Sequence, residues 1–222
     1  MTTHSIWIFI HIMLVVFSLG AEIGIFVSAI HARNSARSFE TRGTLLQVVG
    51  LLDLFPRFSF SLFLPVGVHL TQGLGLYPVT PAILVGSWLI ALAGMLLTIG
   101  LYKYQGTRTA VTVVAIQTAL HLVMGGVFVT IGARSLVAGA PLDQSWFALK
   151  VLLFGLMFWT FVVVEIGSRP LFKAFLAIGK LGSTSEREGQ VRKYFNRSLS
   201  GVSVIYLEIA AIAFLGATKP FL

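Results

Sequence analysis

Apolar residues gather in six long runs along the chain, separated by short polar or basic stretches. A helix needs about 20 mostly apolar residues to cross the roughly 30 Å hydrocarbon core of a bilayer. The pattern therefore predicts an all-α fold, a polytopic bundle of six transmembrane helices that makes a single domain over residues 1–222. The expected helices cover about 6–30, 55–76, 80–104, 109–138, 145–168 and 198–218.

The composition agrees with a membrane protein. Apolar residues make up 56% of the chain and charged residues only 11%, against roughly 25% charged in ordinary soluble domains. This excludes a soluble enzyme and a disordered chain. The absence of Cys excludes disulfides, thiolate metal sites, iron–sulfur clusters and cysteine nucleophiles. The first run follows an N-terminal stretch without Lys or Arg, so we expect a retained span and not a cleaved signal peptide.

Basic residues favour one side of the predicted bundle. The first, third and fifth connections between helices carry thirteen of the sixteen Lys and Arg residues, whereas Arg134 and Lys219 lie on the other side. Because cytoplasmic loops are enriched in Lys and Arg, we expect both termini to be periplasmic, in a bacterial inner membrane. This explains the net charge of +8 without a nucleic-acid partner. The long basic connection, residues 169–197, is expected to be an amphipathic cytoplasmic segment.

Several ionisable side chains fall inside the predicted helices, where they are costly and become functional candidates. His11, His69 and Lys150 each lie about five or six residues from the outer end of their helices. At about 1.5 Å per residue, the two histidines are about 8–9 Å from the outer boundary. His121 lies near the middle of its helix. We expect these groups to converge in the outer half of the bundle.

This convergence indicates a cofactor or metal site. Two histidines on different helices suit the axial positions of one b-type haem, and Lys150 would then pair with a propionate or with Glu208. Three histidines at one level, His11, His69 and His121, would suit copper or zinc instead. The simplest alternative is that each imidazole forms a hydrogen bond to a neighbouring helix. Among haem ligand pairs, His11 with His69 is slightly favoured because His121 lies deeper. His121 could equally be the second ligand, since helix tilt easily moves a residue by several ångströms.

A second set of ionisable residues lies toward the basic side. Opposite charges there can pair between helices and enter the membrane at low cost. We expect a structural ion-pair cluster, with Arg57 bound to one of its acidic neighbours. A path for proton or ion entry is the alternative. The cluster comprises Glu22, Asp53, Arg57, Glu165 and Arg169.

Two segments carry a resemblance to a known group of proteins. The first helix reads Trp-Ile-Phe-Ile-His-Ile from Trp7, and the fifth reads Leu-Lys-Val-Leu-Leu-Phe from Leu149 and ends in Glu-Ile-Gly-Ser-Arg. These segments resemble small bacterial membrane proteins around the copper-resistance D proteins and the HemJ-type protoporphyrinogen oxidases. The resemblance covers roughly a third of the chain, including the second helix. It implies a haem-associated histidine at His11 and a functional lysine at Lys150.

These observations favour a b-type haem-binding integral membrane protein that acts in electron transfer or as an oxidoreductase component. Its partners would be the lipid bilayer and quinol or a periplasmic electron carrier. A copper-handling membrane protein is one alternative. An accessory or assembly subunit of a larger membrane complex is another, and a homo-oligomer is compatible with each of these hypotheses.

Overall fold

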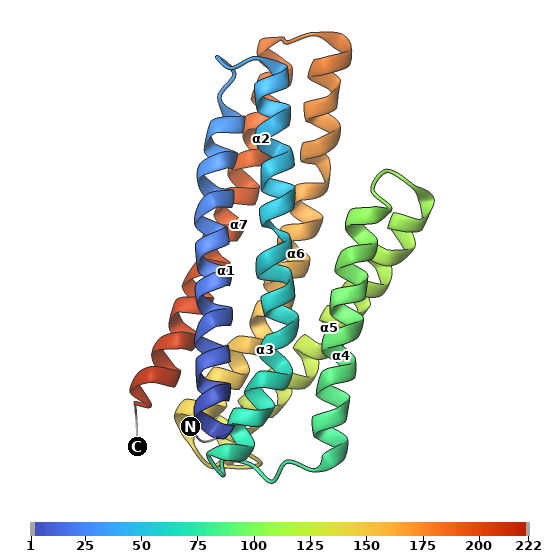
Figure 1. Ribbon diagram of the computed structural model, residues 1–222. Helices are drawn as coiled ribbons and strands as arrows, with labels where there is room; N and C mark the ends of the chain where they lie inside the picture. Colours follow the sequence, from blue (N-terminus) through green and yellow to red (C-terminus); the bar gives the residue numbers. More distant parts are fainter. Residues whose placement is uncertain (1–2, 221–222) are drawn as a thin grey trace.

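The computed structural model describes residues 3–220, which are almost entirely helical (Figure 1). The elements are α1 (Thr3–Arg33), α2 (Phe39–Leu52), α3 (Leu54–Gly73), α4 (Pro81–Lys103), α5 (Arg108–Ala138), α6 (Ser145–Leu181) and α7 (Ser185–Thr218). Helix starts follow local capping chemistry. The hydroxyls of Ser38, Thr80, Thr107 and Thr184 each accept a hydrogen bond from a backbone N–H of the first turn.

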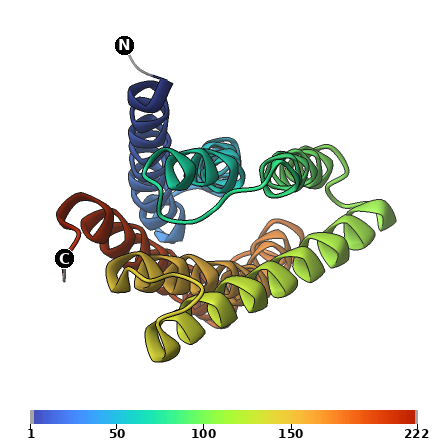
Figure 2. The same cartoon turned by 90° about the horizontal axis from the view of Figure 1, so that it is seen from below.

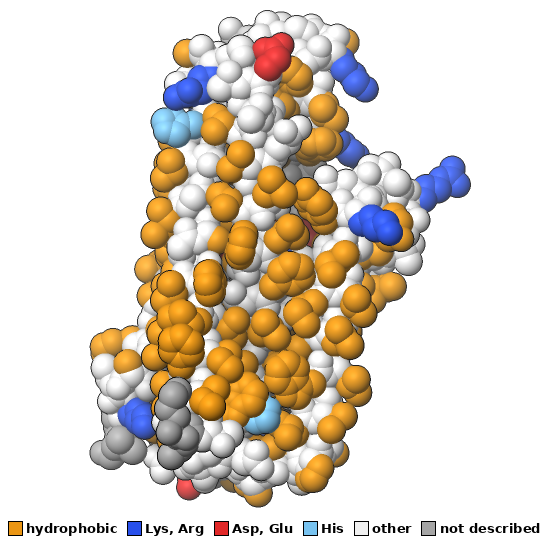
Figure 3. All heavy atoms as spheres, in the orientation of Figure 1, with side chains coloured by type: hydrophobic (Ala, Val, Ile, Leu, Met, Phe, Trp, Pro, Cys, Tyr) orange, Lys and Arg blue, Asp and Glu red, His pale blue; other side chains and the backbone are white. Residues whose placement is uncertain are grey.

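The prediction of six membrane-spanning helices is confirmed within the described residues. Six segments are long and apolar enough to cross a bilayer, the second of them made by α2 and α3 together. Large apolar side chains are exposed on each of these segments, and they cover much of the visible surface in Figure 3. Such a surface is suited to contact with lipid. Both termini lie at the same end of the bundle (Figure 1).

The helices form two layers, seen end-on in Figure 2. α1, α3 and α4 lie side by side in one layer, and α7, α6 and α5 lie side by side in the other. The layers touch along their edges, where α1 packs on α7 and α4 on α5. Between the middle helices α3 and α6, aromatic side chains from the two layers meet, including Phe60, Phe158 and Phe161.

Glycine allows the closest helix pair, α5 and α6, to approach backbone to backbone. A Cβ placed on Gly132 would lie 2.6 Å from the amide nitrogen of Leu152. A Cβ on Gly155 would lie 2.6 Å from that of Val129. Small residues at helix interfaces are typical of membrane bundles, where close van der Waals packing drives association.

Helices α1, α2, α6 and α7 continue past the α4–α5 loop at the end opposite the termini, which we call the basic end (Figure 1). α6 has 37 residues and is about 55 Å long, well beyond a bilayer core of about 30 Å. Residues 169–197 are therefore the end of α6, a short turn and the start of α7, forming a helical hairpin. α6 continues through Pro170 because Phe175 and Ile178 are buried against α2 and α7.

Candidate functional site

His11 and His121 approach α3 from the two different layers. The His11 ring on α1 meets the edge of Phe63, with ring centroids 5.3 Å apart. The His121 ring on α5 meets Phe60 at 6.0 Å. Phe60 and Phe63 are one turn apart on α3, so the two histidines reach this helix at depths that differ by about 4.5 Å. The structure therefore places these two side chains near one another in depth, each against an aromatic residue of α3.

The two imidazoles share a chemical feature, which the ring of His4 near the start of α1 also has. The Nδ1 atom of each is buried and has no hydrogen-bond partner within the described residues. His121 is only 8% exposed and is also surrounded by Phe158 and Phe161, with ring centroids at 5.5 and 6.2 Å. Most buried polar atoms in proteins are hydrogen-bonded, so two orphaned imidazole nitrogens call for an explanation. Metal ligation by the ring is one such explanation.

His69 is engaged differently. Its ring stacks on Trp7 with centroids 3.8 Å apart, and its Nε2 accepts a hydrogen bond of 3.3 Å from the indole N–H of Trp88. It lies nine residues beyond Phe60 on α3, about 13 Å further along the helix axis than the level of His121. The aromatic pair thus gives His69 a structural partner, which His11 and His121 lack.

The three histidines do not form one ligand set here. Over residues 3–220, no three His, Asp or Glu side chains are arranged so that they could hold a metal ion together. A copper or zinc centre built from His11, His69 and His121 is therefore not assembled in this structure. Ligation of haem iron by two histidines does not require such a group.

Lys150 lies on α6 close to His11, with which it interacts electrostatically. Its ammonium packs against α7, where a Cβ on Gly216 would be 2.7 Å from Nζ. One turn earlier, the indole N–H of Trp146 is buried and finds no hydrogen-bond partner among residues 3–220. Lys150 and Glu208 do not pair: the Glu208 carboxyl instead accepts a hydrogen bond of 2.8 Å from Thr160.

The charged residues toward the basic end are brought together as a group. Of the expected acidic partners of Arg57, the structure selects Asp53, whose Oδ2 lies 2.6 Å from Nε. Arg57 also interacts electrostatically with Glu22 on α1 and Glu165 on α6. Glu165 itself lies 3.6 Å from Arg169 on the same helix. Charges from α1, α3 and α6 therefore meet around Arg57.

Arg57 connects this cluster to the histidines. It lies one turn before Phe60 on α3, and its charge acts on His121. One cation thus lies near each of the two orphaned imidazoles, Lys150 beside His11 and Arg57 beside His121.

Sequence patterns missed the most buried ion pair of the described chain. Arg42 on α2 is 1% exposed and contacts Glu188 on α7 at 2.9 Å. Its Nε donates a hydrogen bond to the Ala32 carbonyl at 2.8 Å, and its guanidinium lies over the Phe175 ring. The partners are 146 residues apart, so only the fold reveals the contact. From the sequence alone, Arg42 is only one of the basic residues in the connection between the first two predicted helices.

Comparison with known proteins gives no relative on which to rest an assignment. No protein-family model, curated protein or solved structure matches this chain.

Proposed function

We propose that this chain is a multi-pass membrane protein that binds one b-type haem between its two helix layers and takes part in electron transfer. His11 and His121 are the proposed axial ligands. The observation that carries the proposal is that the two imidazoles come from opposite layers and that each has a buried ring nitrogen without a hydrogen-bond partner among the described residues. The bound haem would supply one-electron redox chemistry at its iron.

The residues around the two histidines fit such a group chemically. Phe60, Phe63 and Phe158 provide an apolar, aromatic environment that excludes water. Lys150 and Arg57 would neutralise the propionates, since each lies near one of the two imidazoles. A dry environment and nearby cations are the means by which a protein retains and tunes a haem.

The proposal includes an orientation. Both termini lie at one end, and the basic residues concentrate in the connections at the other. With the positive-inside rule, we place the basic end in the cytoplasm of a bacterium and the termini in the periplasm. Lys150 and His11 then lie in the outer half of the bundle.

Haem content provides the first test. The purified protein, produced with added haem precursor, should give the Soret and α bands of a b-type haem after reduction with dithionite. His11→Ala and His121→Ala should each lose or shift these bands. His69→Ala is the matched control and should keep them, because His69 is held by Trp7 and Trp88. A haem-free wild-type protein, or unchanged spectra in both ligand variants, would rule out the proposal.

A further inference from the structure

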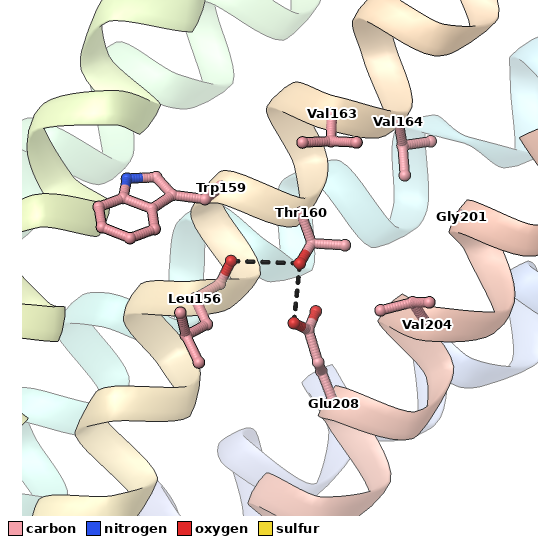
Figure 4. A pocket seen from close by; sticks show the side chains of 8 residues that line it. All are labelled: Leu156, Trp159, Thr160, Val163, Val164, Gly201, Val204 and Glu208. Atoms are coloured by element: carbon pink, nitrogen blue, oxygen red, sulfur yellow. Dashed lines mark hydrogen bonds between the residues drawn. The ribbon is translucent and has the colours of Figure 1, made fainter.

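A shallow groove runs between α6 and α7 (Figure 4). Its volume is about 350 Å³. The lining is apolar except for one carboxyl and one hydroxyl, which belong to Glu208 and Thr160 and are hydrogen-bonded to each other at 2.8 Å. The lining residues are Leu156, Trp159, Thr160, Val163, Val164, Gly201, Val204 and Glu208.

The polar pair in this groove is unexplained by the fold. Glu208 lies about 15 Å from the last residue of α7, near the middle of the bilayer, where an ionisable side chain is costly. One of its carboxyl oxygens is buried without a hydrogen-bond partner in the part of the chain that the structure describes. It forms no ion pair there with Lys150 or any other cation. A carboxyl kept at this depth on a lipid-facing groove points to a polar group that approaches from the bilayer.

The shape of the groove limits what that group belongs to. From Leu156 to Val164 it extends over about 12 Å of helix, less than half of the roughly 30 Å apolar core. A complete transmembrane helix docked here would contact the groove over less than half of its length. A lipid acyl chain has no group that can form a hydrogen bond with the carboxyl. A flat ring with one or two oxygen substituents matches both the apolar walls and the single polar pair.

The groove also connects to the proposed haem ligands. Trp159 lines it and donates its indole N–H to the carbonyl of Leu122, the residue after His121, at 3.2 Å. On the other side of α6, Phe158 packs against His121 at 5.5 Å. A ring bound in the groove would thus be separated from the His121 environment by one helix.

We propose that this groove binds the headgroup of a bilayer-soluble quinone or hydroquinone, with Glu208 and Thr160 bonded to its ring oxygen. A carboxyl or hydroxyl can donate to a quinone carbonyl, and either can accept from a hydroquinone hydroxyl. This inference rests on the proposed function, because the quinone would be the electron-transfer partner of the proposed haem protein. Headgroup binding itself is measured without haem.

Quenching of tryptophan fluorescence by decylubiquinone tests the groove directly. The protein is placed in nanodiscs of quinone-free synthetic phosphatidylcholine, and the signal of Trp159 is the difference between wild type and Trp159→Phe. We expect saturable quenching of this component. Val204→Phe fills the groove, and Glu208→Leu removes the carboxyl, so each should weaken binding by about tenfold or more.

Two controls and one replacement variant keep the result interpretable. Leu207→Phe enlarges an exposed side chain outside the groove and should bind like the wild type. Glu208→Gln keeps the hydrogen-bonding capacity and should bind far better than Glu208→Leu. If Glu208→Leu fails to fold, Thr160→Val replaces it as the variant that removes a polar group, with the same expectation.

Three results would overturn the inference. The first is non-saturable quenching, and the second is equal affinity in Val204→Phe and Leu207→Phe. The third is full relief of the decylubiquinone quenching by an equal concentration of decylbenzene, which would identify an acyl-chain groove. Haem spectra separate this inference from the proposed function. Saturable binding to a haem-free protein would support the quinone site and contradict the haem proposal. A haem-containing protein without saturable binding would support the haem proposal and contradict the quinone site.

Discussion

At the scale of single residues, the sequence predicted roughly how far along its helix each ionisable side chain lies. It did not predict toward which neighbouring helix that side chain points. Counting residues placed His11 and His69 at one level, whereas in the structure His69 stacks on Trp7, one turn from His11 along α1. The rotation of each helix then packs His69 against two tryptophans. It leaves the Nδ1 atoms of His11 and His121 without a hydrogen-bond partner among the described residues. Such rotation depends on packing with other helices, which a single sequence does not reveal.

The Arg57–Asp53 pair should contribute to stability. Its side chains are 26% and 39% exposed, so we expect Arg57→Ala to lower the free energy of unfolding by about 1.5–3 kcal/mol, less than for a fully buried pair. Arg169→Ala is the matched control. That side chain is 51% exposed and lies 3.6 Å from Glu165, so its loss should cost about 1 kcal/mol or less. Thermal unfolding in detergent measures both, and equal melting of Arg57→Ala and wild type would show that Arg57 only reaches toward lipid headgroups.

Arg42 should matter more than any other cation at the basic end. Arg42→Ala removes the ion pair with Glu188, which keeps only its hydrogen bond from Ser183, and the hydrogen bond to the Ala32 carbonyl. Removal of one member of a buried pair costs about 3–5 kcal/mol. The exposed Lys193, on the same hairpin, is the control, and Lys193→Ala should change stability by about 0.5 kcal/mol or less. Unfolding in detergent followed by circular dichroism checks the pair. Indistinguishable curves for the two variants would contradict a stabilising role for Arg42.

At the scale of elements, the apolar runs predicted all six long helices because burial in lipid imposes a helix on any such run. The extent of the helices at the basic end was not predictable in the same way. The apolar run suggested an end near residue 168, yet Phe175 and Ile178 are buried against α2 and α7, and α6 continues to Leu181. This packing joins segments distant in sequence, and local pattern does not encode it.

The α5–α6 contact should tolerate no side chain at its glycines. Gly155→Ala would place a Cβ 2.6 Å from the backbone of Val129, so we expect a loss of about 1–3 kcal/mol or a separation of the two helices. Gly126→Ala, on α5 with open space around it, should be neutral or slightly stabilising. Melting temperatures in one detergent give the comparison. A Gly155→Ala protein as stable as Gly126→Ala would mean that the two backbones do not approach this closely.

At the scale of the whole molecule, the two layers hold the proposed haem site between them and the basic extension at one end. The orientation can be tested with topology reporters. A reporter fused after Leu222 should be active only as a periplasmic enzyme, and one inserted after Gly106, in the α4–α5 loop, only as a cytoplasmic enzyme. The opposite pair of activities would invert the bundle and move His11 to the inner half.

The central claim, a haem held by one histidine from each layer, is tested most directly by electron paramagnetic resonance of the oxidised, purified protein. Two imidazole ligands predict a low-spin ferric signal in the wild type. His11→Ala and His121→Ala should each convert it to a high-spin signal or abolish it, and His69→Ala should leave it unchanged. A wild-type protein with no haem signal, or a low-spin signal that survives loss of either His11 or His121, would contradict the account.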